Sequence, residues 1–144
     1  TCFSKAYSEI NAVKGSDAMK LFASYLYNPE YKIVGHNLLN FVVYIVNVWR
    51  KLLKLTSDYS FVDRIIDTRS IATAIAKNIP VDQDNFLAWQ YKMVNYVERG
   101  LRTSQATLLK RYDIPHDPKR LHDALYDLTM NYKIFRKQLY EIEL

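Results

Sequence analysis

The chain has 144 residues, of which 49% are hydrophobic and 24% charged, a balance that is typical of one globular domain and excludes a disordered chain. Three glycines and four prolines are too few for the many turns of a β-sandwich or barrel, and the single cysteine, Cys2, excludes a disulfide framework and a cysteine-ligated zinc site. The net charge of +5 favours anionic partners, and the sparse use of cysteine predicts an intracellular protein, without indicating the compartment.

The first predicted elements are a terminal segment and a short helix. Residues 1–15 are expected to be a loosely ordered N-terminal segment, and because the chain begins with Thr1 rather than methionine, we expect a processed or excised fragment. Ser16 and Asp17 are suited to cap a helix that runs to about Tyr27, since the apolar residues that follow them recur at helical spacing.

A second helix is predicted between Asn28 and the loop at 56–59. Asn28 and Pro29 have the residue types of an N-cap and a first helical position. The run at 41–46, FVVYIV, favours a strand when taken alone, but polar residues around it recur at spacings of three and four, which indicates a helix. Residues 33–49 carry no formal charge, yet their three asparagines would be costly in hydrocarbon, so we predict a core helix and no transmembrane span.

Two further helices are predicted in the middle of the chain. Ser60 and Asp63 have the spacing of a capping box, at the start of a helix whose apolar face is continuous and which ends before Pro80. Asp82 and Asp84 can cap the next helix, and the pattern after them predicts one long helical stretch that reaches about Asp113, either straight or bent at Gly100.

The last helix carries the most regular pattern in the sequence, and Asp117 and Pro118 are predicted to start it. Its large apolar residues recur at spacings of four and three, as in the seam of a heptad repeat: Leu121, Leu125, Leu128, Tyr132, Phe135, Leu139 and Ile142. Burying each such side chain contributes ~1.5–3 kcal/mol, so we expect the seam to be covered. We predict that it packs on the preceding long helix, with another chain as the alternative partner.

Together these elements predict an all-α fold in which residues 1–144 form a single domain. The expected architecture is a mostly antiparallel bundle of five or six helices with a long C-terminal antiparallel helical hairpin. The sequence contains no glycine-rich phosphate loop, no Rossmann fingerprint and no G-x-S-x-G motif, so we expect no cofactor. A non-enzymatic role is favoured, and an enzymatic one is left open.

Arginine, histidine and aspartate gather in one segment, RYDIPHDPKRLHD, which begins at Arg111. Arg111 and His116 are separated by four residues, and this spacing resembles the Arg-x4-His motif of the HEPN helical-bundle ribonucleases. The resemblance implies that His116 acts on a 2′-hydroxyl or leaving oxygen while Arg111 holds a phosphate. The sequence departs from the family pattern at Tyr112, where a polar residue is usual, and at Pro115 within the spacer. We favour the interpretation that the segment separates two helices.

A metal site is a further alternative for the same segment. Histidine and carboxylate side chains are suitable ligands, and five are present: Asp113, His116, Asp117, His122 and Asp123. No two histidines stand four residues apart on a helix, and two of these side chains fall in the predicted turn, so we predict no metal site. His36 is interpreted as a hydrogen-bonded core histidine rather than a ligand.

A basic face is predicted on the long helix. At 100° per residue, four basic side chains project into a sector of under about a quarter-turn: Lys92, Arg99, Arg102 and Lys110. Such a face either keeps a protein soluble or contacts phosphates or an acidic protein. The sequence shows no signature of base-specific recognition, so electrostatic contact with a nucleic-acid backbone is the form of nucleic-acid binding left open.

The leading functional hypothesis is a non-enzymatic protein–protein interaction module or a subunit of a larger assembly, with a protein partner or a second copy as its ligand. The chain contains twelve tyrosines, and this residue suits half-buried and interface positions. Tyr126 and Tyr140, beside the heptad seam, are therefore predicted to belong to a contact surface. The alternative hypothesis is a nucleic-acid-binding protein, including a HEPN-like ribonuclease that uses Arg111 and His116.

Overall fold

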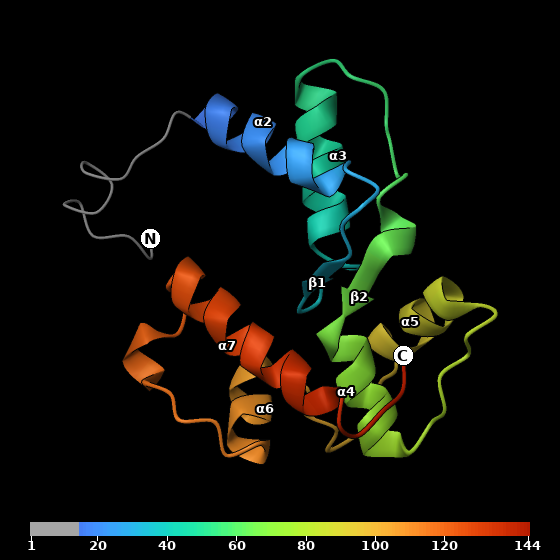
Figure 1. Cartoon of the computed structure of the whole chain (residues 1–144), viewed down its shortest axis with the longest axis vertical. Helices are drawn as coiled ribbons and strands as arrows, with labels where there is room; N and C mark the ends of the chain where they lie inside the picture. The colour runs from blue at the N-terminus through green and yellow to red at the C-terminus, as the bar shows by residue number, and fades with distance from the viewer. Residues whose placement is uncertain (1–14) are drawn as a thin grey trace.

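The structure is a computed structural model that describes residues 15–144, so the prediction for the N-terminal segment lies outside the described residues. Within residues 15–144 the chain forms six α-helices: α2 (Gly15–Leu26), α3 (Val42–Leu52), α4 (Thr68–Lys77), α5 (Phe86–Val94), α6 (Gln105–Arg111) and α7 (Ala124–Gln138). Two 3-10 turns, η1 (Val62–Arg64) and η2 (Pro118–Arg120), and two short strands, β1 (Ile33–Gly35) and β2 (Ile65–Asp67), accompany them (Figure 1). The prediction of a mostly helical fold is confirmed.

The two strands correct the prediction of an all-α fold, because they form a small parallel sheet. Its register pairs Ile33 with Ile65, Val34 with Ile66 and Gly35 with Asp67. Parallel strands need a crossover connection, and α3 lies in that connection. The strands fall where β-branched residues are adjacent, and they shorten two predicted helices, which begin at Val42 and Thr68 instead of near Asn28 and Ser60.

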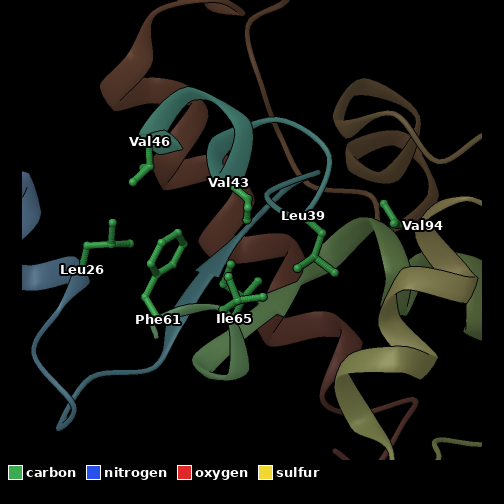
Figure 2. Packing of buried hydrophobic residues seen from close by; sticks show 8 residues of the cluster. Leu26, Leu39, Val43, Val46, Phe61, Ile65 and Val94 are labelled. Carbon is green, nitrogen blue, oxygen red and sulfur yellow. The ribbon is translucent and has the colours of Figure 1, made fainter. Parts of the chain in front are cut away.

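One hydrophobic cluster joins α2 and α3 to the sheet (Figure 2). Its buried members are Leu26, Leu39, Val43, Val46, Phe61, Val62, Ile65 and Val94. The ring of Phe61 is fully buried and meets the ring of Tyr27 edge-on, with a centroid distance of 5.6 Å. Such a geometry adds to the energy of apolar burial, so this aromatic pair helps to fix α2 against the strand segment.

α3 confirms that the apolar run at 41–46 is helical, but it lies less deep than the predicted core helix. Val43 and Val46 are buried, whereas Tyr44 is 67% exposed and Ile45 43% exposed. In the part of the chain that the structure describes, no helix has both the length and the hydropathy needed to cross a membrane.

Arg64 joins η1 to the C-terminal end of α2. Its guanidinium donates to three backbone carbonyl oxygens, those of Leu26 at 2.6 Å, Asn28 at 2.6 Å and Tyr31 at 2.8 Å. The last carbonyls of a helix have no partner within the helix, so this side chain supplies donors that the backbone lacks.

We expect Arg64→Ala to lower the free energy of unfolding by about 2–3 kcal/mol, because three charged hydrogen bonds to backbone oxygens, two of them part-buried, are lost. The measurement is hydrogen exchange with denaturant titration, and the amides of α2 should lose protection first. Arg99→Ala is the matched control, because Arg99 is exposed and its side chain forms no hydrogen bond within residues 15–144. Unchanged protection of α2 in Arg64→Ala would contradict the assigned role.

The predicted long helix up to Asp113 is interrupted, because residues 95–104 leave the helical conformation between α5 and α6. Gly100 has φ +89°, a conformation that glycine adopts without the strain of a side chain. Ser104 then caps α6, its hydroxyl accepting a hydrogen bond from the backbone N–H of Thr107. α6 has only seven residues, and α7 packs against α4 and β1 as well as α6, so neither the long hairpin nor the antiparallel bundle is confirmed.

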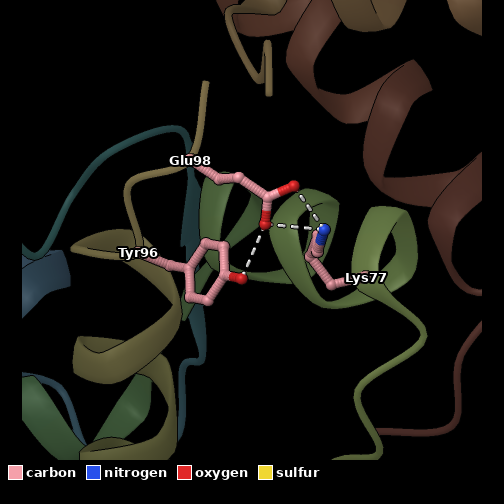
Figure 3. Close-up of polar contacts among 3 residues, drawn as sticks. All are labelled: Lys77, Tyr96 and Glu98. Carbon is pink, nitrogen blue, oxygen red and sulfur yellow. Dashed lines mark hydrogen bonds and ion pairs between the residues drawn. The ribbon is translucent and has the colours of Figure 1, made fainter. Parts of the chain in front are cut away.

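Glu98 ties this connecting segment to α4 (Figure 3). Both carboxylate oxygens of Glu98 lie 2.7 Å from Nζ of Lys77, and the Tyr96 hydroxyl donates to one of them at 2.8 Å. The hydrogen bonds from Lys77 and then Tyr96 lower the pKa of the Glu98 carboxyl, so Glu98 remains ionised and bound to Lys77.

α7 buries a different face from the one that the heptad pattern predicts. Four seam residues are largely exposed: Leu125 at 69%, Leu128 at 61%, Tyr132 at 60% and Leu139 at 48%. The buried residues are Met130, Asn131, Ile134 and Gln138, whose mean direction lies roughly 135° away at 100° per residue. Phe135 is half-buried, but the prediction that the seam packs on the preceding helix is wrong for the four exposed residues of this seam. Its ends, Leu121 and Ile142, are half-buried against neighbouring clusters.

Candidate binding surfaces

A buried carboxylate organises the middle of the structure. Asp67, at the end of β2, is fully buried and accepts hydrogen bonds from the backbone N–H groups of Asn37 at 2.9 Å, Leu39 at 3.0 Å and Arg69 at 2.9 Å. The contact with Arg69 caps α4, and the other two hold the turn that follows β1. Asp67 therefore fixes the backbone of two segments that lie far apart in the sequence.

Thr68, the next residue, connects α7 to the sheet. Its Oγ1 donates to the carbonyl of Gly35 at 3.2 Å and accepts from Nδ2 of Asn131 at 2.9 Å, while its backbone oxygen accepts from Nε2 of Gln138 at 2.8 Å. Both amides are buried on α7. Buried polar groups need such partners, and this explains why a hydrophobic pattern alone placed the buried face of α7 incorrectly.

His36 lies beside this network, in the turn after β1, and its Nδ1 is 3.1 Å from Oγ1 of Thr68. This position agrees with a hydrogen-bonded histidine, although His36 belongs to a turn and not to an apolar helix. Burial lowers the pKa of His36, and the nearby charge of Asp67 and a backbone hydrogen bond at Thr103 counteract this only in part. The imidazole is therefore neutral at pH 7.

A cleft of about 500 Å³ opens next to His36. The turn after β1 lines it with His36 and Asn37, and α4 lines it with Arg69. The segment before α6 contributes Arg102 and Ser104, and α6 itself contributes Thr107, among others. We call it the arginine cleft. Its lining contains two arginines and no carboxylate, and no carboxylate lies within ion-pair distance of Arg69 or Arg102 in the described residues 15–144.

The four basic residues of the predicted helix face are all exposed, but they do not share one helix. Lys92 lies on α5, Arg99 and Arg102 on the connecting segment, and Lys110 on α6. The prediction of a single helical sector is therefore wrong, because the helix is interrupted at 95–104. Arg102 is the member of this set that lines the arginine cleft, and a binding role for the others stays a prediction.

Arg111 and His116, the pair with the HEPN-like spacing, are engaged separately. Arg111 ends α6, and its Nη2 lies 3.2 Å from a carboxylate oxygen of Glu141. His116 lies in the turn that follows, where its Nδ1 is 2.9 Å from the carbonyl oxygen of Ile114. The resemblance requires a continuous helical turn between the two residues, and the segment between Arg111 and His116 is not helical. Across residues 15–144, no group of three or more His, Cys, Asp or Glu side chains is placed to hold a metal ion.

The two tyrosines predicted at a contact surface differ in their surroundings. Tyr126 is half-buried, its hydroxyl accepts from the backbone N–H of Asp117 at 2.6 Å, and the guanidinium of Arg120 lies 4.4 Å from its ring centroid. Tyr126 therefore fastens η2 to α7. Tyr140 is 84% exposed beside a hollow of about 400 Å³ that Lys133 and Arg136 also line.

The exposed seam residues of α7, Leu125, Leu128, Tyr132 and Leu139, form what we call the α7 ridge. Figure 1 shows α7 running from the left of the view towards α4, with α6 below it and β1 above it, and α7 contacts both. Val34 of β1, Leu128 and Tyr132 line a hollow of about 360 Å³ at the middle of the ridge. By helical geometry Lys133 and Arg136 lie along one flank of the ridge, so an apolar line and a basic line run side by side.

The chain was compared with protein-family models, with curated proteins and with solved structures, and none of the three comparisons found a match.

Proposed function

We propose that this protein is a non-enzymatic interaction module that binds a partner protein through the α7 ridge. The observation that supports the proposal is the exposure of four large apolar side chains in one line, between 48% and 69%, on a helix whose opposite face is packed. Contiguous exposed apolar surface is unusual in a protein without a partner and marks interaction sites. The nucleic-acid alternative stays a prediction that rests on exposed Arg99 and Arg102.

The chemistry around the ridge favours an amphipathic partner helix with acidic residues on its flank. The hollow beside Leu128 and Tyr132 suits an apolar side chain of the partner, as in helix-in-groove recognition. Lys133 and Arg136 on the flank are exposed and form no ion pair within residues 15–144, so they suit carboxylates.

A second copy of the chain fits this surface less well. In an antiparallel two-fold pair of α7 ridges, the basic flanks of both copies, with Lys133 and Arg136, would lie on the same side of the contact. Like charges placed in this way oppose association. We therefore assign the ridge to a different protein of acidic character.

A photo-cross-linking experiment tests the proposal. Benzoylphenylalanine is placed at position 132 on the ridge or, as a matched control, at position 44, where Tyr44 is 67% exposed on α3. In extract from the source cells, we expect position 132 to give a discrete cross-linked species and position 44 not to give it. Adding Lys133→Glu and Arg136→Glu should reduce the yield of that species about ten-fold, because the charge that attracts the partner is reversed.

Two results would contradict the proposal. One is the same cross-linked species from positions 132 and 44, which would indicate indiscriminate hydrophobic contact. The other is a yield that charge reversal leaves unchanged. A dimer of the chain cross-linked to itself through position 132 would assign the ridge to self-association instead of an acidic partner.

A further inference from the structure

We propose that the arginine cleft binds a dianionic phosphate group, carried by a phosphate monoester or present as inorganic phosphate, between the guanidinium groups of Arg69 and Arg102. This site goes beyond the proposed function and is separate from it, because no residue of the α7 ridge lines the cleft. The argument rests on how the two arginines are held, on which charges surround them, and on the size and donors of the cleft.

Arg69 is held in place by its neighbours before any ligand arrives. Its backbone N–H donates to Oδ1 of Asp67, which fixes the residue in the first turn of α4, and its Nη1 donates to Oδ1 of Asn37 at 3.0 Å. One of the five N–H donors of the guanidinium is used in this contact, and the side chain is half-buried. A planar, pre-oriented guanidinium loses little freedom when it forms a bidentate contact with a phosphate.

The charges near the cleft leave both arginines available. Asp67 is the nearest buried acid, but its two oxygens are occupied by three backbone N–H groups, and it does not line the cleft. Glu98, the acid closest to Arg102 along the chain, is bound to Lys77 and Tyr96 (Figure 3). Neither carboxylate forms an ion pair with Arg69 or Arg102. The two guanidinium groups outnumber the single nearby charge of Asp67, so the charge beside the cleft is net positive.

The remaining lining supplies hydroxyl donors and enough space. The hydroxyl groups of Ser104 and Thr107 lie 2.8 Å apart and share one hydrogen bond, and Ser104 also accepts from the backbone N–H of Thr107. One hydroxyl hydrogen of the pair therefore remains for a ligand. A volume of about 500 Å³ lies within the ~300–1,000 Å³ typical of small-molecule sites, so it admits a phosphate together with an organic group. Charge-assisted, bidentate contacts are the strongest that such donors make.

The test is a titration of the ¹⁵N-labelled chain, followed by amide and arginine Nε chemical shifts. The probes are inorganic phosphate, adenosine 5′-monophosphate, adenosine, and a short RNA without a terminal phosphate. We expect saturable shifts at 36–37, at 69 and at 101–107 with the monophosphate or with inorganic phosphate, and none with adenosine. The two phosphate probes distinguish a monoester ligand from free phosphate.

Matched variants separate a defined site from general positive charge. Arg102→Gln should weaken binding about ten-fold, as should Arg69→Gln, whereas Arg99→Gln should leave it unchanged, because Arg99 is exposed on the same segment but does not line the cleft. Arg102 forms no hydrogen bond or ion pair within residues 15–144, so its replacement keeps the test valid even if Arg69→Gln affects folding. The proposal is overturned if no saturable shifts occur, if Arg99→Gln weakens binding as much as Arg102→Gln does, or if adenosine gives the same shifts as the monophosphate. It is also overturned if the RNA is the only probe that binds.

Discussion

Asp67→Ala is expected to lower the free energy of unfolding by about 3–5 kcal/mol, because three backbone N–H groups, one buried and two part-buried, lose a charged acceptor. The carboxylate is fully buried, and its partners belong to the turn after β1 and to the first turn of α4. Removing it also removes the N-cap of α4, which alone is worth about 0.5–2 kcal/mol.

The measurement is equilibrium denaturation in urea, with Asp63→Ala as the matched control. Asp63 is exposed in η1, so its replacement should change the free energy of unfolding by less than ~0.5 kcal/mol. A loss of less than about 1 kcal/mol in Asp67→Ala would show that the carboxylate does not hold the two segments together.

Asp67→Asn gives a finer test of the same geometry. Oδ1 accepts two of the three hydrogen bonds, from Asn37 and Arg69, and Oδ2 accepts one, from Leu39. An asparagine oxygen can replace Oδ1, but its amide nitrogen would then face the N–H of Leu39. We therefore expect a loss of stability between those of the control and Asp67→Ala, and an asparagine as damaging as alanine would contradict the assigned hydrogen bonds.

The local features of the fold were those most open to prediction from the sequence. The apolar spacing after residue 17 correctly predicted α2, although the helix begins at Gly15, so Ser16 and Asp17 lie inside it and not at its cap. Asp117 is a cap, since its side chain accepts from the backbone N–H of Lys119, but it caps the 3-10 turn η2. The prediction that Asp117 and Pro118 start the last helix is wrong, because α7 begins at Ala124 with Asp123 as its N-cap. These signals act over one or two turns of backbone, which is the range that spacing and capping preferences describe.

The features that sequence patterns missed depend on contacts between distant segments. β1 and β2 pair across roughly thirty residues, and nothing in either tripeptide indicates which strand it meets. Asp67 directly precedes a helical pattern, and this signal could have identified it as the N-cap in place of Ser60. The arginine cleft unites Arg69 with Arg102, and its existence depends on the break at 95–104, which the long apolar pattern concealed.

The buried face of α7 leads to the second large prediction. Ile134→Ala should lower the free energy of unfolding by about 3–4 kcal/mol, because Ile134 is fully buried and its loss leaves a cavity. Its cluster comprises Ala72, Leu108, Leu109, Ile114 and Met130. The heptad pattern predicts the opposite order, with Leu128 in the core and Ile134 outside the seam.

Leu128→Ala is therefore the matched comparison, on the same helix and with a similar loss of volume. Leu128 is 61% exposed, so we expect a change below ~0.5 kcal/mol in urea denaturation. Equal losses in the two variants, or a larger loss in Leu128→Ala, would show that the seam is packed within the chain. If instead Leu128→Ala retains full stability but loses the cross-linked species captured at position 132, then the exposed leucine serves binding and not folding. That result would separate the two faces of α7, since Asn131 and Gln138 hold one face to Thr68 while the ridge stays accessible to a partner.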